Sequence, residues 1–172
     1  MLEPATHDDH PAIVTLVNHA YRGGGAKESW NAESGIIDGP RITLDQLRRD
    51  LDANPSARVM IHRAAGGNVR ASVWLEPSAD ETWYLGMLAI DPTAQALGVG
   101  RHMLAAIEAY VAGQGGRRIR MTVLNVRETL IAWYERRGYG RTGEIEAFPY
   151  EDQRFGKPLR DDLAFVVLTK DL

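Results

Sequence analysis

The chain has 172 residues with 20 lysines and arginines, 23 aspartates and glutamates and no cysteine, which gives a formal net charge of −3. The length favours one domain with its own core, expected to span residues 1–172. The lack of cysteine excludes a disulfide framework, a thiolate nucleophile and a thiolate metal site, and no other metal site is predicted. Without a long apolar run, a signal peptide or a basic balance, we expect a cytoplasmic protein that binds neither membranes nor nucleic acid.

A first amphipathic helix is predicted over residues 6–23. Its apolar side chains recur at i, i+3, i+4, i+7 and i+8, and a run of three glycines marks its end. Pro11 belongs in the first turn of a helix, where its missing N–H costs nothing. A cap at Asp8 therefore fits better than a start at the capping box that Thr6 and Asp9 resemble.

The segment 23–40 is too long for a simple connection, so we expect it to be functional or partly helical. A second helix is predicted to begin at Thr43, because Gln46 stands at the capping-box position and leucines follow at helical spacing.

The rest of the chain alternates between strands and helices. Strands are expected over 57–63, 69–76, 81–90, 119–124, 139–147 and 163–168, and helices over 98–112 and 128–137. The strand 119–124 is nearly continuous in apolar character, so it is expected to be buried on both faces. The order predicts an α/β (α+β) fold with a mixed sheet that is not doubly wound.

A glycine-rich turn carries the most specific signal. The pattern Gln95-x-x-Gly98-x-Gly100 follows Pro92 and leads directly into a helix. Such a turn directs several backbone N–H groups, together with the positive end of the helix dipole, into one small space. This indicates a site for a phosphate or pyrophosphate. A dinucleotide fingerprint would need a third glycine where Met103 stands, and no P-loop string occurs. A glycine turn without a ligand remains as the alternative.

The pattern closely resembles motif A of the GNAT superfamily of N-acetyltransferases, Arg/Gln-x-x-Gly-x-Gly/Ala. Two further stretches are similar to the family: Ala5-Thr6-x-x-Asp9 before the first helix, and Leu130 to Tyr139, which resembles its Tyr-Glu-x-x-Gly-Phe/Tyr motif. The resemblance covers most of the chain. It implies a mixed sheet of six to seven strands, splayed at the centre between 85–90 and 119–124 and flanked by about four helices.

The resemblance also implies that the chain binds acetyl-CoA. In the family, the strand before the turn pairs with the pantetheine arm, and the matching residues are Leu88, Ala89 and Ile90. The pyrophosphate would lie on the turn and the start of the helix, formed by Gln95, Ala96, Leu97, Gly98, Val99, Gly100 and Arg101. Arg127 stands where the family often has an asparagine that bonds the CoA arm. Asn125 is the candidate substitute, with an asparagine satisfied within its turn as the alternative.

Tyr134 aligns with the family tyrosine that serves as the acid for the departing CoA thiolate. A phenol with an unperturbed pKa near ~10 is protonated at neutral pH, and a core aromatic is the alternative reading. No general base is evident. Glu33 is the candidate, against a solvated loop glutamate or a water chain. Without cysteine, the acetyl group is expected to pass directly from CoA to the amine.

In this family the segment after the first helix shapes the acceptor pocket. Its candidate lining residues suit an amine beside an anionic or aromatic group; they are Trp30, Arg22, Arg41 and Tyr84. The excursion 148–162 is expected to cover the acceptor side or a subunit interface. We expect an acetyl-CoA-dependent N-acetyltransferase that acts on an amine of a small molecule or peptide. The alternative is a non-catalytic acyl-CoA-binding sensor or interaction module. Many relatives dimerise, so a homodimer is a further expectation, although the sequence shows no interface signal.

Overall fold

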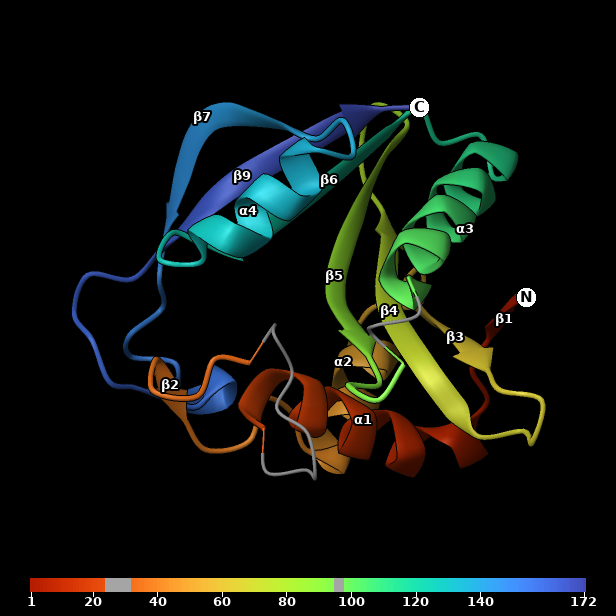
Figure 1. Ribbon diagram of the computed structural model, residues 1–172, viewed down its shortest axis with the longest axis horizontal. Coiled ribbons are helices and arrows are strands. Elements are labelled where there is room, and N and C mark those ends of the chain that lie inside the picture. The colour runs from red at the N-terminus through yellow and green to blue at the C-terminus, as the bar shows by residue number, and fades with distance from the viewer. Residues whose placement is uncertain (24–31, 95–97) are drawn as a thin grey trace.

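The computed structural model describes residues 1–23, 32–94 and 98–172 (Figure 1). The α-helices of this part are α1 (His10–Arg22), α2 (Leu44–Ala53), α3 (Val99–Gly113) and α4 (Glu128–Glu135), with 3-10 helices η1 (His7–Asp9) and η3 (Gln153–Phe155). Its strands are β1 (Leu2–Pro4), β2 (Ile37–Asp38), β3 (Arg58–Arg63), β4 (Val69–Pro77), β5 (Thr82–Ile90), β6 (Arg118–Leu124), β7 (Gly140–Ala147), β8 (Lys157–Pro158) and β9 (Ala164–Asp171). None of these helices has the length and apolar character needed to cross a membrane.

The main sheet has seven strands in the order β1-β3-β4-β5-β6-β9-β7. Only β5 and β6 run parallel, joined by the crossover through α3, and the other neighbours are antiparallel. One core cluster contains apolar side chains of α3 and α4, and a second contains those of α1 and α2, so the two pairs of helices pack on opposite faces of β5. The predicted class, a mixed α/β sheet flanked by four helices, is confirmed.

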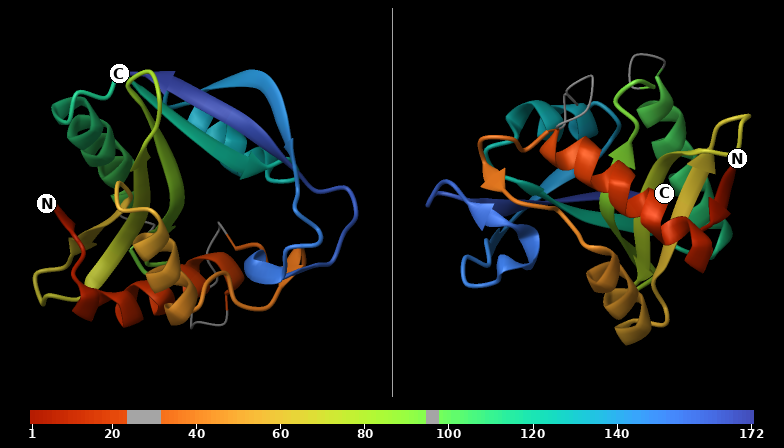
Figure 2. Two further views of the ribbon diagram at one scale, coloured as in Figure 1. Left: turned by 180° about the vertical axis from the view of Figure 1, so that it is seen from behind. Right: turned by 90° about the horizontal axis from the view of Figure 1, so that it is seen from below.

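The sheet opens between its two central strands. Strands β5 and β6 are paired over only three residues of each strand, of which Tyr84 and Arg120 are the last. Beyond that point β5 has a β-bulge, in which Met87 and Leu88 together lie opposite Val73 of β4, and Met87 adopts a positive φ of 50°. A bulge bends its strand and increases its twist, so β5 diverges from β6. Figure 1 and the left view of Figure 2 show the resulting V between β4–β5 and β6–β9–β7. The predicted splay is confirmed.

The expectation that both faces of β6 are buried is wrong. Ile119, Met121 and Val123 lie in the core, whereas Arg120 and Thr122 between them are only partly buried. Buried and partly buried residues alternate along β6 because its second face borders the opening of the sheet. There, Arg120 forms an ion pair with Glu146 of β7.

The start of the first helix combines both readings of the sequence. Asp9 accepts hydrogen bonds from the backbone N–H and hydroxyl of Thr6, at 2.8 and 2.9 Å, so the capping box is present. It caps η1 rather than an α-helix, and α1 begins only at His10, with Pro11 in its first turn. The expected cap at Asp8 falls within η1, one residue before Asp9, which is the N-cap of α1.

A two-stranded pair was not predicted. Strand β2 in the segment after α1 pairs with β8 in the excursion before β9. Gly156 makes this approach feasible: its φ is +93°, and a Cβ there would lie 2.4 Å from the carbonyl oxygen of Asp38. Two residues are too short for a periodic signal, yet the pair joins the two segments that border the opening of the sheet.

Candidate active site

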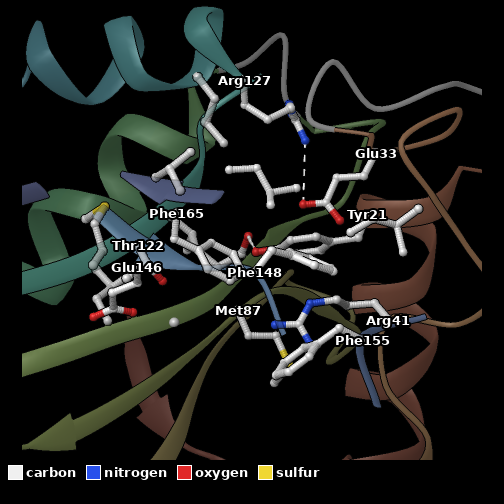
Figure 3. A pocket seen from close by; sticks show the side chains of 18 of the residues that line it. Tyr21, Glu33, Arg41, Met87, Thr122, Arg127, Glu146, Phe148, Phe155 and Phe165 are labelled. Carbon is white, nitrogen blue, oxygen red and sulfur yellow. Dashed lines mark hydrogen bonds and ion pairs between the residues drawn. The ribbon is translucent and has the colours of Figure 1, made fainter. Parts of the chain in front are cut away.

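A cavity of about 250 Å³ lies where β5 and β6 diverge (Figure 3). Its walls come from β5, β6, the end of α1 and the segment after it, α4 and the excursion before β9. The side chains at its centre are mainly aromatic and charged; they include Tyr21, Arg41, Tyr84, Arg127, Tyr134, Phe148 and Phe155.

Tyr134 projects from α4 into this cavity and belongs to the core cluster that spans β5 and β6. It is 6% exposed and lies edge-on to the rings of Trp133 and Tyr139, at centroid distances of 5.0 and 5.6 Å. Burial raises the pKa of the Tyr134 phenol well above its ordinary value of 10. The group is therefore neutral at physiological pH and carries a proton beside the cavity.

The predicted phosphate turn is described only from Gly98 onward, because Gln95, Ala96 and Leu97 lie outside the described residues. Gly98 has a φ of +72° at the N-cap of α3, a left-handed conformation that favours glycine, and Val99 begins the helix. Gly100 lies beside Trp133, where a Cβ would be 3.5 Å from the indole ring.

Positive charge gathers near the start of α3. Arg101 is exposed in the first turn of the helix. Burial lowers the pKa of Arg137 first, and the neighbouring Arg136 and Arg101 lower it further. The Arg137 guanidinium stacks 3.7 Å above the ring of Trp133. Arg137 was missed in the sequence, since nothing there places the end of α4 beside the start of α3.

Leu88, Ala89 and Ile90 form the end of β5, beyond the last residue that pairs with β6. The Tyr21 hydroxyl donates a hydrogen bond to the Leu88 carbonyl oxygen at 3.3 Å. Burial raises the pKa of Tyr21 to about 12. In the sequence, Tyr21 belongs to the apolar stripe of the first helix and to the start of the segment that shapes the acceptor pocket in the family, but its bond to β5 was not predicted.

Asn125 follows the end of β6, and its side-chain amide is hydrogen-bonded to nearby backbone groups. Its Nδ2 donates to the carbonyl oxygen of Asp162 at 2.9 Å, and its Oδ1 accepts from the N–H of Ala164 at 3.0 Å. These bonds hold the start of β9 and correspond to the alternative reading of a satisfied turn asparagine. The contacts do not favour the predicted role on the CoA arm.

Glu33 lies on the cavity wall, 8% exposed, and faces two arginines. One carboxylate oxygen forms an ion pair with Arg22, and the other lies 3.8 Å from Nη1 of Arg127. Burial lowers the pKa of Arg127, and the charge of Glu33 opposes that shift. The sequence pointed to Glu33 and Arg22 separately and treated Arg127 only as a departure from the family pattern.

Arg22 lines the cavity, but its guanidinium is already bonded to groups of the protein itself. Besides Glu33, it donates to the carbonyl oxygens of Gly39 and Phe155, at 2.8 and 2.6 Å. These bonds join the end of α1 to both segments beside the cavity. They do not favour the predicted binding of a substrate by Arg22.

Tyr84 lies on the cavity wall as expected, with its hydroxyl 3.5 Å from the hydroxyl of Thr122. The ring lies along its own strand, where a Cβ on Gly86 would come within 2.7 Å of it. Trp30 lies outside the described residues. The excursion contributes Phe148 and Phe155 to the walls, so it covers the cavity.

Known proteins share this fold. A family model described as the acetyltransferase (GNAT) family matches residues 27–139. A ribosomal-protein-alanine N-acetyltransferase from Brucella melitensis superposes with a TM-score of 0.70 at 16% identity, over 100% of this chain and 99% of that chain. The ribosomal-protein-S18-alanine N-acetyltransferase from Escherichia coli gives 0.70 at 15% identity, over 99% and 92%. A GNAT family acetyltransferase from Elizabethkingia anophelis with acetyl-CoA bound gives 0.62 at 15% identity, over 73% and 83%.

At such identities the solved structures show the fold alone, and no curated protein sequence matches the chain. The family model spans more than half of the chain and includes the glycine turn and the Tyr134 motif, which carried the resemblance. The chain therefore belongs to the acetyltransferase (GNAT) family, a family of N-acetyltransferases.

Proposed function

We propose that this protein transfers an acetyl group directly from acetyl-CoA to an amine of a small molecule or peptide, within one domain that spans residues 1–172. The observation that carries the proposal is the position of Tyr134, a buried neutral phenol on the wall of the cavity that opens between β5 and β6. A proton donor beside a slot between strands suits a reaction that releases a thiolate.

The residues present fit acetyl-CoA. Among the described residues, no strand of the main sheet pairs with the edge of β5 that faces β6 beyond Tyr84, which suits a pantetheine arm laid along Leu88 to Ile90. The start of α3 offers the left-handed Gly98, backbone N–H groups and the nearby charges of Arg101 and Arg137, which suit phosphates. When bound, acetyl-CoA supplies the acetyl thioester.

Tyr134 is proposed to hold a proton at Oη and to donate a hydrogen bond to the sulfur that leaves. A thiol ordinarily has a pKa near ~8.5, well below the raised pKa of this phenol. Tyr134 therefore stabilises the thiolate mainly by a hydrogen bond, because complete transfer of its proton would be unfavourable.

Glu33 is proposed to position its neighbours. Both of its oxygens face guanidinium groups, which leaves the carboxylate poorly placed to accept a proton from an amine. We assign it to holding Arg22 and Arg127 at the cavity, and the amine loses its proton to water before it attacks.

A screen of amines and short peptides for acetyl-CoA-dependent thiol release tests the proposal, with acetyl-CoA binding measured in parallel by calorimetry. Turnover of at least one amine, with acetylated amine as the product, is the expected result. Tight binding of acetyl-CoA without thiol release over the whole panel would instead favour a non-catalytic sensor.

A further inference from the structure

Within the part of the chain that the structure describes, one guanidinium in the cavity has no carboxylate bound to it. The other two arginines on the wall face Glu33, whereas Arg41 forms no ion pair with any carboxylate of the described residues. Its guanidinium carbon lies over the rings of Tyr21 and Phe155, at 5.5 and 5.2 Å from their centroids (Figure 3). The cavity therefore holds a positive charge that its described carboxylates leave uncompensated.

Arg41 lies where two cavities adjoin. The second cavity, of about 390 Å³, shares Arg41, Tyr84, Met87 and Phe155 with the first, so a ligand that extends from one into the other passes this guanidinium. Tyr134 lines the first cavity only. An acceptor whose amine is near Tyr134 can thus place a second group against Arg41.

The surroundings of Arg41 select for an anion. Aromatic rings cover part of the planar guanidinium and hold it in place, while its N–H groups in the plane can bond both oxygens of a carboxylate. Among the described residues, Glu146 is the other carboxylate on the wall of the first cavity besides Glu33, and it is ion-paired with Arg120, so it opposes an incoming anion only weakly. Asp50 lines the second cavity together with Arg154, whose positive charge counters it.

The walls favour a small ligand over a folded protein surface. The excursion before β9 closes one side, held by the β2–β8 pair and by the bond from Arg22 to the Phe155 carbonyl oxygen. Cavities of about 250 and 390 Å³ lie near the lower end of the volumes typical of small-molecule sites.

We infer that the acceptor is a small amine that carries a carboxylate, and that Arg41 binds this carboxylate. The inference rests on the proposed N-acetyltransferase function and makes Arg41 a residue that determines specificity.

Matched acceptors test the inference. We would measure thiol release with common L-amino acids and their carboxamides, and with ω-amino acids of increasing length and the corresponding alkylamines. In the wild type, the best carboxylate acceptor should exceed its uncharged partner about 10- to 100-fold in kcat/KM, the range for a charge-assisted bidentate bond. The amine of an amide loses its proton more readily than that of the free amino acid, so this bias works against the expected result.

Arg41→Met keeps an apolar side chain over the rings and removes the charge. It should abolish the preference for carboxylates through a rise in KM, with kcat/KM for the uncharged partners within about 3-fold of wild type. Arg41→Lys should restore part of the preference. The control is Arg49→Met, the same change at an exposed position of α2 that lines neither cavity, and it should match the wild type.

Turnover that does not discriminate between carboxylates and their uncharged partners, or that is confined to peptides, would overturn the inference and uphold the proposed function. A preference for carboxylates that survives in Arg41→Met would overturn the assignment to Arg41. Absence of thiol release over all amines would overturn the proposed function and the inference with it.

Discussion

Oε1 of Glu33 lies 3.8 Å from Nη1 of Arg127, which joins the segment after α1 to the first residue before α4 across the cavity. Both side chains are about nine-tenths buried, and Glu33 bonds Arg22 at the same time. One carboxylate thus offsets the charges of two buried guanidinium groups, which come from α1 and from the residue before α4.

Glu33→Gln removes that charge with little change in shape. It leaves the buried guanidinium groups of Arg22 and Arg127 without the carboxylate that they share, so the free energy of unfolding should fall by about 3 kcal/mol. Urea denaturation measures this loss. The matched change Glu144→Gln, at an exposed ion pair with Arg120, should cost no more than about 1 kcal/mol.

The same Glu33→Gln variant separates positioning from base catalysis. A positioning role predicts a higher KM for the acceptor and a pH profile of kcat with the same shape as that of the wild type. Loss of the acidic limb of that profile, together with a fall in kcat at unchanged KM, would show that Glu33 is the base after all.

Tyr134→Phe removes the proposed proton donor and keeps the ring in its edge-on contacts with Trp133 and Tyr139. We expect kcat to fall about 100-fold, a typical effect of losing one hydrogen bond to the charge that develops in the transition state, with the affinity for acetyl-CoA unchanged. Steady-state kinetics and calorimetry measure the two quantities. A variant with full kcat across the pH range would rule out the donor role.

Gly98 and Gly100 form a matched pair at the start of α3. An alanine at position 98 would have to adopt a φ of +72°, which is unfavourable by about 1–2 kcal/mol, whereas a Cβ at position 100 makes ordinary contact with Trp133. Gly98→Ala should therefore raise the KM for acetyl-CoA about 10-fold and lower stability, and Gly100→Ala should do neither. Equal effects of the two changes would refute this account of the turn.

Alkaline pH should destabilise the fold through Tyr21. Burial raises its pKa from 10 to about 12, so the unfolded chain releases the proton first as the pH rises. The stability from this group is complete below about pH 10 and is lost between 10 and 12, by up to about 2.7 kcal/mol for a two-unit shift. Urea midpoints at pH 9 and 11 should fall less in Tyr21→Phe than in the wild type, and parallel losses would contradict the assignment.

The sequence predicted the order of the long elements because each has a strong period or a glycine boundary. The splay of the sheet between β5 and β6 was implied by the family resemblance. The strand pair β2–β8 was missed because strands of two residues have no periodic pattern in the sequence. Strand β6 was misjudged because Arg120 and Thr122, which interrupt its apolar run, were given too little weight.

The site could be predicted as a set of residues but not as a set of partners. The sequence offered Arg22 and Arg41 as equivalent candidates for the acceptor pocket. Folding gives Arg22 a carboxylate and two carbonyl oxygens, and gives Arg41 two aromatic faces. Such a difference arises from contacts between distant segments, which local periodicity does not report.

The bulge at Met87 means that the slot depends on the number of residues in β5 as well as on their identity. Two residues of β5 lie opposite Val73 alone, so deletion of Met87 would restore an unbroken ladder with β4. Leu85, Leu88 and Ile90 would still face the same core cluster, but β5 would lose the bend that separates it from β6. Within this part of the chain, natural variants with substitutions should therefore be tolerated far more often than variants that gain or lose a single residue.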